Sequence, residues 1–178
     1  MFKGDDQARV PINVNAVIRQ TFTLVQGELR SKEIISRLEL LNDLPRVLGS
    51  RVQLQQVILN LIMNAVEALG TVSDHARTLQ VTSSLNQVGD VSVTVDDSGP
   101  GIDPAVVERI FDPFLTTKPQ GMGMGLSICR TIIEGHGGRI WASPGDPQGS
   151  IFHIVLPALE PNNVTGGLTH DYDTLHPQ

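Results

Sequence analysis

Apolar side chains recur at helical spacing in three segments of the chain. The first runs from Pro11 to about Arg30, with Asn13 in position to cap its start. The second covers residues 51–69, contains neither glycine nor proline, and places its apolar residues at i, i+3, i+4 and i+7. The third covers residues 126–133 and follows a glycine-rich stretch. These patterns predict three amphipathic helices, of which the second is the clearest.

Between these segments the pattern changes to an alternation of apolar and polar residues, which is typical of half-buried strands. It runs roughly through residues 34–40 and more clearly through residues 78–86 and 91–96. The last two runs flank the turn-forming pair Gly89-Asp90, which indicates a hairpin with one solvated face. Two further strands are expected in the segments HGGRIWAS and SIFHIVLP, which a turn rich in glycine and proline separates.

The order of these elements predicts one α+β domain, with a sheet that helices cover on one face. The domain spans residues 11–157, and within it residues 41–50 form a turn and a short extended piece, and residues 104–110 a short helical piece. Residues 1–10 are polar and without period, and we expect a leader or residual linker there. Residues 158–178 are polar and rich in Gly, Asn, Thr and His, so we expect a disordered tail.

The charge balance excludes one class of function. The 178-residue chain carries 13 basic and 19 acidic side chains, a formal charge of −6, and no run of Lys and Arg. Binders of nucleic acid or of anionic membranes usually carry such a run, so we expect neither a nucleic-acid partner nor direct membrane contact. An anionic ligand must then be held locally by a few cations, a metal ion or backbone N–H groups.

The cysteine count and the hydropathy of the chain bear on the cellular location of the domain. The single Cys129 forms no intrachain disulfide and cannot build a four-cysteine zinc site, which favours a reducing, cytoplasmic location. No stretch reaches the roughly 18 apolar residues that a membrane-spanning helix needs. A membrane anchor in a longer parent protein remains compatible with these observations.

Three polar side chains share one face of the clearest predicted helix. Asn60, Asn64 and Glu67 lie at i, i+4 and i+7, and asparagine is a mediocre helix former because its side chain competes for backbone hydrogen bonds. One interpretation is a solvated face. The other is that Asn64 offers its amide oxygen to Mg²⁺, a hard cation that proteins usually share with substrate phosphates.

The segment DDSGPGI, which ends at Ile102, follows a predicted strand directly. Its glycines, Gly99 and Gly101, allow positive φ angles and a close approach of ligand to backbone. An ordinary turn explains the glycines and the proline, but not two consecutive aspartates at the mouth of a strand. A buried carboxylate there could accept a hydrogen bond from an exocyclic amino group such as that of adenine.

The segment GMGMGLS opens the third predicted helix. Glycines at a helix start leave free backbone N–H groups at the positive end of the helix dipole, which is a ready anion site. Lys118 lies just upstream and adds a cation, although a solvated loop lysine is the plain alternative. The segment matches neither the lysine-bearing P-loop nor a dinucleotide-binding fingerprint.

In combination, the asparagine-bearing helix, the Asp-x-Gly-x-Gly turn, the FDPF-TTK segment and the glycine-rich helix start resemble the catalytic and ATP-binding domain of bacterial sensor histidine kinases. The wider relatives are the gyrase, Hsp90 and MutL type ATPases. The resemblance covers roughly residues 11–157, and FDPFLTTKPQGMGMGLSICRTIIEGHGG looks most like the oxygen-sensing and nitrogen-regulatory branch. It implies a two-layer α/β sandwich with a mixed sheet, the Bergerat-type ATP-binding fold.

The resemblance also implies a role for each matched residue. Asn64 would ligate Mg²⁺, Asn60 would lie close to the ATP phosphates, and Asp97 would accept the adenine amino group. Phe111 and Phe114 would pack the base of the ATP lid. The other residues placed at the nucleotide are Gly99, Gly101, Ile102, Thr117, Lys118, Gly121, Gly123, Gly125 and Leu126. Asn60 and Lys118 would be the catalytic pair, with ATP and Mg²⁺ as cofactors.

This sequence departs from the family pattern at three points. Glu67 stands where many members carry a basic residue, and the lid between Lys118 and Gly121 is very short. None of the five histidines is followed by the acidic residue and proline of the phosphoacceptor box, and His136, in a glycine-rich turn, is expected to be structural. The implied partners are therefore a dimerisation and phosphoacceptor histidine domain and, indirectly, a response regulator.

Position 60 bears on the type of reaction. In the hydrolytic relatives a glutamate one turn before the metal-binding asparagine orients water, whereas this chain has Asn60 there. An amide cannot act as a general base, which favours phosphoryl transfer to a histidine over hydrolysis. A nucleotide-binding regulatory module without turnover, or an ATPase of the wider superfamily, is the alternative function.

Overall fold

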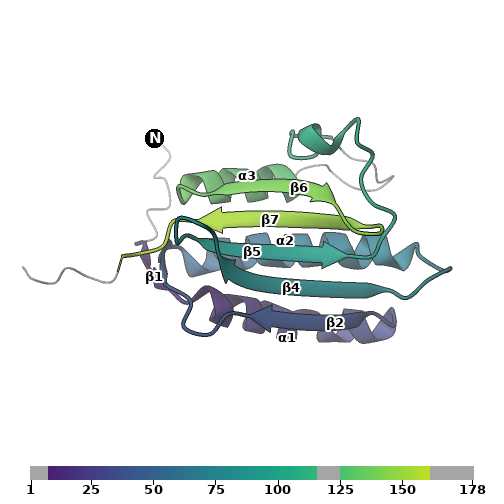
Figure 1. The fold of residues 1–178 in the computed structure, drawn as a ribbon, viewed down its shortest axis with the longest axis horizontal. Helices are drawn as coiled ribbons and strands as arrows, with labels where there is room; N and C mark the ends of the chain where they lie inside the picture. Colours follow the sequence, from purple (N-terminus) through teal and green to yellow (C-terminus); the bar gives the residue numbers. More distant parts are fainter. Residues whose placement is uncertain (1–7, 116–124, 161–178) are drawn as a thin grey trace, which may run out of the picture.

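The computed structural model describes residues 8–115 and 125–160, which form two layers. Three helices pack behind a five-stranded sheet (Figure 1). The elements are β1 (Val10–Ile12), α1 (Val14–Ser31), β2 (Ile35–Leu40), β3 (Val47–Gly49), α2 (Arg51–Gly70), β4 (Thr78–Leu85), β5 (Val91–Asp97), α3 (Gly125–Gly135), β6 (Arg139–Pro144) and β7 (Ser150–Leu156). The predicted α+β class is confirmed.

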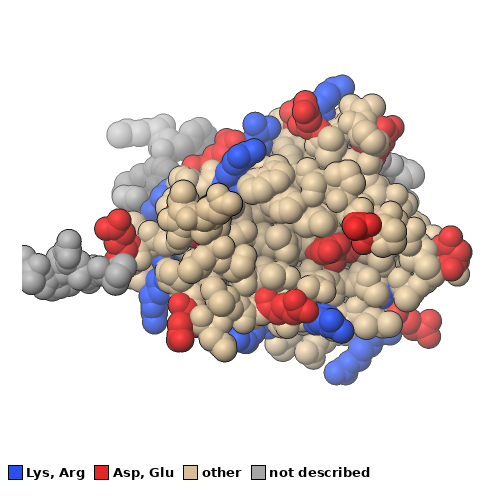
Figure 2. All heavy atoms as spheres, viewed as in Figure 1, with Lys and Arg blue, Asp and Glu red and all other residues tan. Residues whose placement is uncertain are grey.

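The large sheet is mixed, as predicted. Its strand order is β2-β4-β5-β7-β6, in which β2 pairs with β4 in parallel and the other neighbours are antiparallel. Along β5 and β7 buried residues alternate with half-buried ones, because only one face of the sheet is covered by helices. Figure 2 views the open face, on which acidic and basic groups are scattered.

The predicted helices form where the periodicity places them. Asn13 caps α1 by accepting a hydrogen bond from the Ala16 N–H at 3.2 Å, and Ser50 caps α2 by accepting from the Gln53 N–H at 3.4 Å. Residues 104–110 form only a short 3-10 turn, Val107–Arg109. No helix in the part of the chain that the structure describes is long and apolar enough to cross a membrane.

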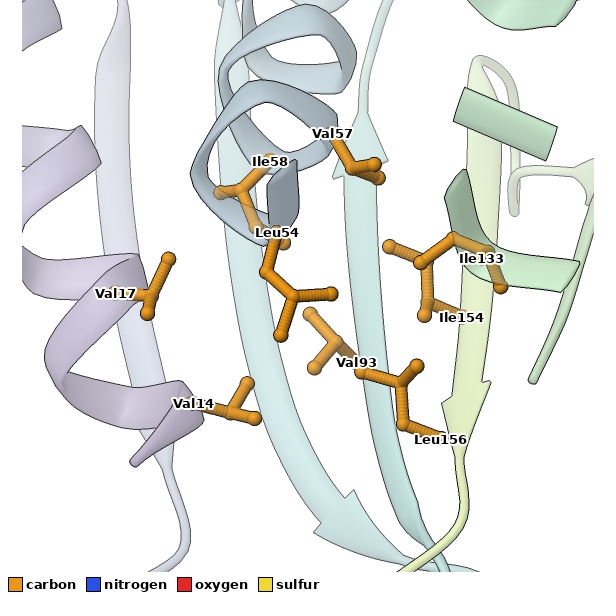
Figure 3. A pocket seen from close by; sticks show the side chains of 9 residues that line it. All are labelled: Val14, Val17, Leu54, Val57, Ile58, Val93, Ile133, Ile154 and Leu156. Atoms are coloured by element: carbon orange, nitrogen blue, oxygen red, sulfur yellow. The ribbon is translucent and has the colours of Figure 1, made fainter. Parts of the chain in front are cut away.

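The core lies where all three helices meet β5 and β7. Figure 3 shows nine apolar side chains that converge there around a pocket of about 10 Å³. They are Val14, Val17, Leu54, Val57, Ile58, Val93, Ile133, Ile154 and Leu156. This volume is about that of one water-sized probe, so this pocket is part of a packed core and is too small for a nucleotide.

The two predicted domain boundaries require correction. Residues 1–10 were expected to precede the domain, but Val10 begins β1 and pairs with Gly49 of β3. The tail was expected to begin at residue 158, but Ala158 forms a bridge with Val47 of β3. Segments this short carry no readable periodicity, and their pairing partners lie far along the chain. Residues 1–7 and 161–178 lie outside the described residues.

His136 has the structural role that its position predicts. Its buried ring accepts the Ser50 N–H at Nε2 over 3.0 Å, and its Nδ1–H donates to the Ile132 carbonyl over 2.7 Å. These two partners fix the tautomer, because one ring nitrogen must accept and the other must donate. The ring therefore joins the end of α3 to the first turn of α2.

Gly49→Ala is expected to destabilise the fold by about 1–3 kcal/mol, the usual cost of overpacking. A Cβ at position 49 would lie 2.5 and 2.7 Å from ring atoms of His136. The measurement is the free energy of unfolding in urea. Gly27→Ala is the matched control, because no heavy atom lies within 4 Å of its added Cβ. That change should stabilise α1 by about 0.5–1 kcal/mol. Equal losses in both variants would contradict the packing argument.

Candidate nucleotide-binding site

Asp97 ends β5 in the row of residues that faces the helices. The alternation that buries Val91, Val93 and Val95 also buries Asp97, which is 3% exposed. Its Oδ1 accepts the Gly99 N–H at 2.9 Å, and the Ser150 backbone donates a second bond. Burial raises the pKa of Asp97 to about 6, an effect that the two hydrogen bonds oppose. A buried carboxyl held in this way is typical of a binding site.

The turn after Asp97 leaves little room for a side chain at Gly99 or Gly101. A Cβ on Gly99 would lie 2.7 Å from the Asp97 Oδ1 and 3.2 Å from the Cβ of Ala68 on α2. Gly101 has φ +83°, and a Cβ there would lie 3.1 Å from the Gly149 carbonyl oxygen. The two glycines are therefore needed for contact with α2 and with the turn between β6 and β7, whatever a ligand adds.

The asparagine-bearing face of α2 leads directly to this turn. Asn60, Asn64 and Ala68 lie at i, i+4 and i+8, and Ala68 is the residue beside Gly99. Both asparagines are half-buried, and Glu67 is exposed. Tertiary packing thus places the asparagine-bearing face of α2 and the Asp97 turn along one side of the molecule, with the turn at the end of that face.

Asn60 is not simply solvated, because it contacts α3. Its Nδ2 donates to the Cys129 Sγ at 3.6 Å. The Cys129 thiol in turn donates to the Val57 carbonyl oxygen, 4.0 Å away. Burial raises the pKa of Cys129 to about 11, so the thiol keeps its proton at neutral pH. With the proton directed at Val57, the sulfur can accept the hydrogen bond from Asn60.

The other predicted site residues lie at different depths. Phe111 is buried and packs edge-to-face on Phe152 of β7, with ring centroids 6.2 Å apart. Phe114 is 74% exposed and has φ +64°. Ile102 and Leu126 are half-buried against the core, and Gly125 is the first residue of α3. Thr117, Lys118, Gly121 and Gly123 lie outside the described residues.

Three residues that no sequence motif singles out support the Asp97 turn. Ser98 accepts the Thr78 N–H at 2.8 Å and donates to the Ala76 carbonyl at 2.9 Å through its hydroxyl. His75 contacts the Ser98 carbonyl oxygen at 2.7 Å. Gly149 has φ +94°, and a Cβ there would lie 1.8 Å from the Asp97 carbonyl oxygen. Only the glycine could have been found from sequence, as a turn residue directly before a strand.

The donor set fits a magnesium ion that is held mostly by a ligand. Within residues 8–115 and 125–160 no three His, Cys, Asp or Glu side chains gather as a metal site. Asn64, half-buried on the asparagine-bearing face of α2, carries an amide oxygen, a type of ligand that Mg²⁺ accepts. Mg²⁺ prefers oxygen ligands, keeps several waters and usually takes phosphate oxygens from the substrate, so one protein ligand suffices.

Comparisons with known proteins agree on one family. Residues 49–160 match the model of the family described as histidine kinase-, DNA gyrase B-, and HSP90-like ATPase. The chain is 35% identical over 150 residues to the sensor protein TdiS of Thauera aromatica, covering 84% of this chain and 27% of that protein. It is 38% identical over 160 residues to the sensor protein FixL of Bradyrhizobium diazoefficiens, covering 90% of this chain and 31% of that protein.

Solved structures give the same result. The catalytic domain of histidine kinase ThkA superposes with a TM-score of 0.75 at 38% identity, over 85% of this chain and 97% of that chain. ThkA in complex with the response regulator protein TrrA superposes with a TM-score of 0.72 at 36% identity, over 85% of this chain and 42% of that chain. The chain spans less than a third of the length of the two curated relatives.

Proposed function

Because the chain belongs to the family of histidine kinase-, DNA gyrase B- and HSP90-like ATPases, we propose that it is the ATP-binding catalytic domain of a sensor histidine kinase. The family predicted from the four sequence motifs is confirmed. The observation that carries the proposal is the buried Asp97 carboxyl at the end of β5, beside the asparagine-bearing face of α2. Assignment to the oxygen-sensing and nitrogen-regulatory branch stays a prediction.

ATP binding divides among three groups of residues. The Asp97 carboxylate accepts a hydrogen bond from the adenine amino group, and Gly99 and Gly101 let the base approach the turn. Asn64 would hold Mg²⁺, which would supply the positive charge that neutralises the phosphates. Lys118 and the backbone N–H groups of the glycine-rich helix start bind the phosphates. These local devices allow an acidic chain to bind a polyanion.

Asn60 favours transfer over hydrolysis. Its Nδ2 donates to Cys129, which leaves the amide oxygen to contact the reacting groups, and an amide can orient a group but cannot remove a proton. The bond from the γ-phosphorus to the β-phosphate bridging oxygen breaks, a bond to an imidazole nitrogen forms, and ADP leaves. The acceptor histidine lies on a dimerisation domain, since no histidine here has the phosphoacceptor pattern.

The remaining partners follow from the relatives. ThkA has been solved in complex with the response regulator protein TrrA. By analogy, a response regulator receives the phosphoryl group from the phosphorylated histidine of the parent protein. The single cysteine supports a reducing, cytoplasmic location for the domain.

Calorimetry and a transfer assay test this function together. We expect the chain to bind ATP with Mg²⁺, to show negligible autophosphorylation alone, and to phosphorylate a matching dimerisation and histidine domain in trans. Failure to bind ATP or ADP at millimolar nucleotide would overturn the proposal. Rapid ATP hydrolysis by the isolated chain that Asn60→Ala abolishes would replace the kinase with an ATPase. Binding without transfer to any matching domain would leave a regulatory module.

A further inference from the structure

The imidazole of His75 connects two loops beside the adenine site. It lies between α2 and β4, where its Nδ1 is 2.7 Å from the Asp74 Oδ1. Its Nε2 is 2.7 Å from the carbonyl oxygen of Ser98. Ser98 stands between Asp97 and Gly99, so this contact reaches the middle of the turn that forms the site.

Both partners of the ring are hydrogen-bond acceptors. A carboxylate and a backbone carbonyl offer no proton, and a neutral imidazole carries a single N–H. In the neutral form one ring nitrogen would direct its lone pair at an oxygen 2.7 Å away. The imidazolium donates at both nitrogens and satisfies both contacts, so the geometry is that of protonated His75.

The contact with Ser98 is transmitted to Asp97 through one rigid peptide group. The Ser98 carbonyl and the Gly99 N–H belong to the same planar unit. The carbonyl end accepts from His75, and the N–H end donates to the Asp97 Oδ1 at 2.9 Å. Fixing the carbonyl therefore fixes the direction of the N–H, and a cation at one end strengthens the bond to the carboxylate at the other.

The groups around His75 also favour its protonated form. The hydrogen bond to the Ser98 carbonyl is the largest effect that raises the pKa of His75, and the Asp74 carboxylate adds to it while desolvation opposes it. Arg77 directs its guanidinium elsewhere, to the carbonyl oxygens of Val72 and Lys32 at 2.9 and 2.7 Å. From β5, Asp97 directs its carboxylate to the Gly99 N–H.

We propose that His75, in its protonated form, is a positioning residue that holds the turn from Asp97 to Gly99 in the form that binds the nucleotide base. The inference rests on the proposed function, because that turn is the adenine site. It adds a pH-dependent control: the turn is held while His75 carries its proton and is released as the pH rises through the raised pKa of His75.

The expected pH profile of ATP affinity has two limbs with different origins. On the acid side Asp97 takes up a proton, with a pKa of about 6, and stops accepting from adenine. On the alkaline side His75 loses its proton and the turn loosens. We expect the alkaline limb to weaken affinity about twofold to fivefold, the range of partly exposed charge interactions. Affinity is therefore highest between the two titrations.

The test measures ATP affinity by calorimetry from about pH 5 to about pH 9, a range that brackets both titrations. In His75→Gln the amide donates to Ser98 at every pH, so the alkaline limb should disappear while affinity stays high. In His75→Ala the ATP affinity should already be low at the pH values at which His75 of the wild type is protonated, and it should not fall further on the alkaline side. Asp74→Asn removes the charge that supports the imidazolium, so the limb should move to lower pH. A purely structural role predicts no such movement.

His153→Gln is the control, with its side chain on the open face of the sheet. The His153 ring stacks on Trp141 and contacts the Ser143 hydroxyl at 2.7 Å, away from the Asp97 turn. This variant should keep the wild-type profile. Loss of the alkaline limb in His153→Gln, or an unchanged limb in His75→Ala, would overturn the inference.

A second measurement reads the turn without nucleotide. In the NMR spectrum of the full chain, the Gly99 amide resonance should follow the titration of the His75 ring. An amide that does not follow the ring overturns the inference and leaves ATP binding, and hence the proposed function, untouched. If the amide follows the ring but ATP does not bind at any pH, the proposed function is overturned and the coupling between ring and turn stands.

Discussion

Asp97→Asn is expected to weaken ATP binding by about 10- to 100-fold, the loss that corresponds to one hydrogen bond to a buried charged group. The carboxylate is an acceptor only, whereas an asparagine can turn an NH₂ group toward the adenine amino group and repel it. Calorimetry with ATP and GTP gives both the affinity and the preference between the two bases. Unchanged affinity and unchanged preference would remove Asp97 from the adenine site.

The same substitution has an opposite effect on stability. Burial raises the pKa of Asp97 from 3.8 to about 6, so the folded state holds this proton more tightly than the unfolded state. The protonated carboxyl stabilises the folded state fully below about pH 3.8, and this stabilisation is lost as the pH rises to about 6. At neutral pH the ionised carboxylate thus costs the fold about 3 kcal/mol. Asp97→Asn should raise the thermal midpoint at about pH 7.5 but not at about pH 4.

Asp96→Asn is the matched control for the effect on ATP binding. Asp96 precedes Asp97 on β5, and its half-buried side chain belongs to the opposite face of the sheet. Its loss should leave ATP affinity within about a factor of two, as for a charge outside the site. Weaker ATP binding together with a higher thermal midpoint identifies a residue that serves binding at the expense of stability. Weaker binding with a lower midpoint would indicate a structural role instead.

Asn64→Ala is expected to lower Mg²⁺-dependent transfer to a histidine domain by about 100-fold or more, a loss typical of one electrostatic group at a phosphoryl centre. The variant should also lose the increase in ATP affinity that Mg²⁺ gives to the wild type. Its affinity for ATP without Mg²⁺ should change little. The measurements are transfer rates and nucleotide affinities across a Mg²⁺ titration.

Gln56→Ala controls for the change in α2 itself. Gln56 is an exposed amide on the same helix, and alanine at either position favours the helix. Transfer by Gln56→Ala should equal that of the wild type. Full Mg²⁺-dependent transfer by Asn64→Ala would refute the metal assignment. Equal losses of transfer with and without added Mg²⁺ would indicate a general role in nucleotide binding.

Much of the fold was predictable because its elements are locally encoded. α2 follows from a run of apolar residues at 3.6-residue spacing that no glycine or proline interrupts before its end. The hairpin of β4 and β5 follows from alternation on both sides of a glycine turn. β1 was not predictable, because three residues contain too little pattern and their partner, β3, lies more than thirty residues away.

In the candidate site, too, some residues could be predicted from the sequence and others could not. Asp97, Asn60 and Asn64 stand out in the sequence because polar residues interrupt an apolar pattern. The partners that hold them do not: Cys129 reaches Asn60 across two helices, and His75 reaches Ser98 across two loops. These contacts join residues distant in sequence, and no local pattern records them.

The sequence by itself determined the longer helices and strands, the family and the residue types of the site, because helical and strand periods and turn chemistry act over a few neighbouring residues. The tertiary structure alone decided how these parts meet. Packing of Ala68 against Gly99 places the asparagines beside the Asp97 turn. Burial at the end of β5, and not the identity of the residue, raises the pKa of Asp97. The contact of His75 with the Ser98 carbonyl is likewise set by packing, because it forms only where the folded chain brings their two loops together.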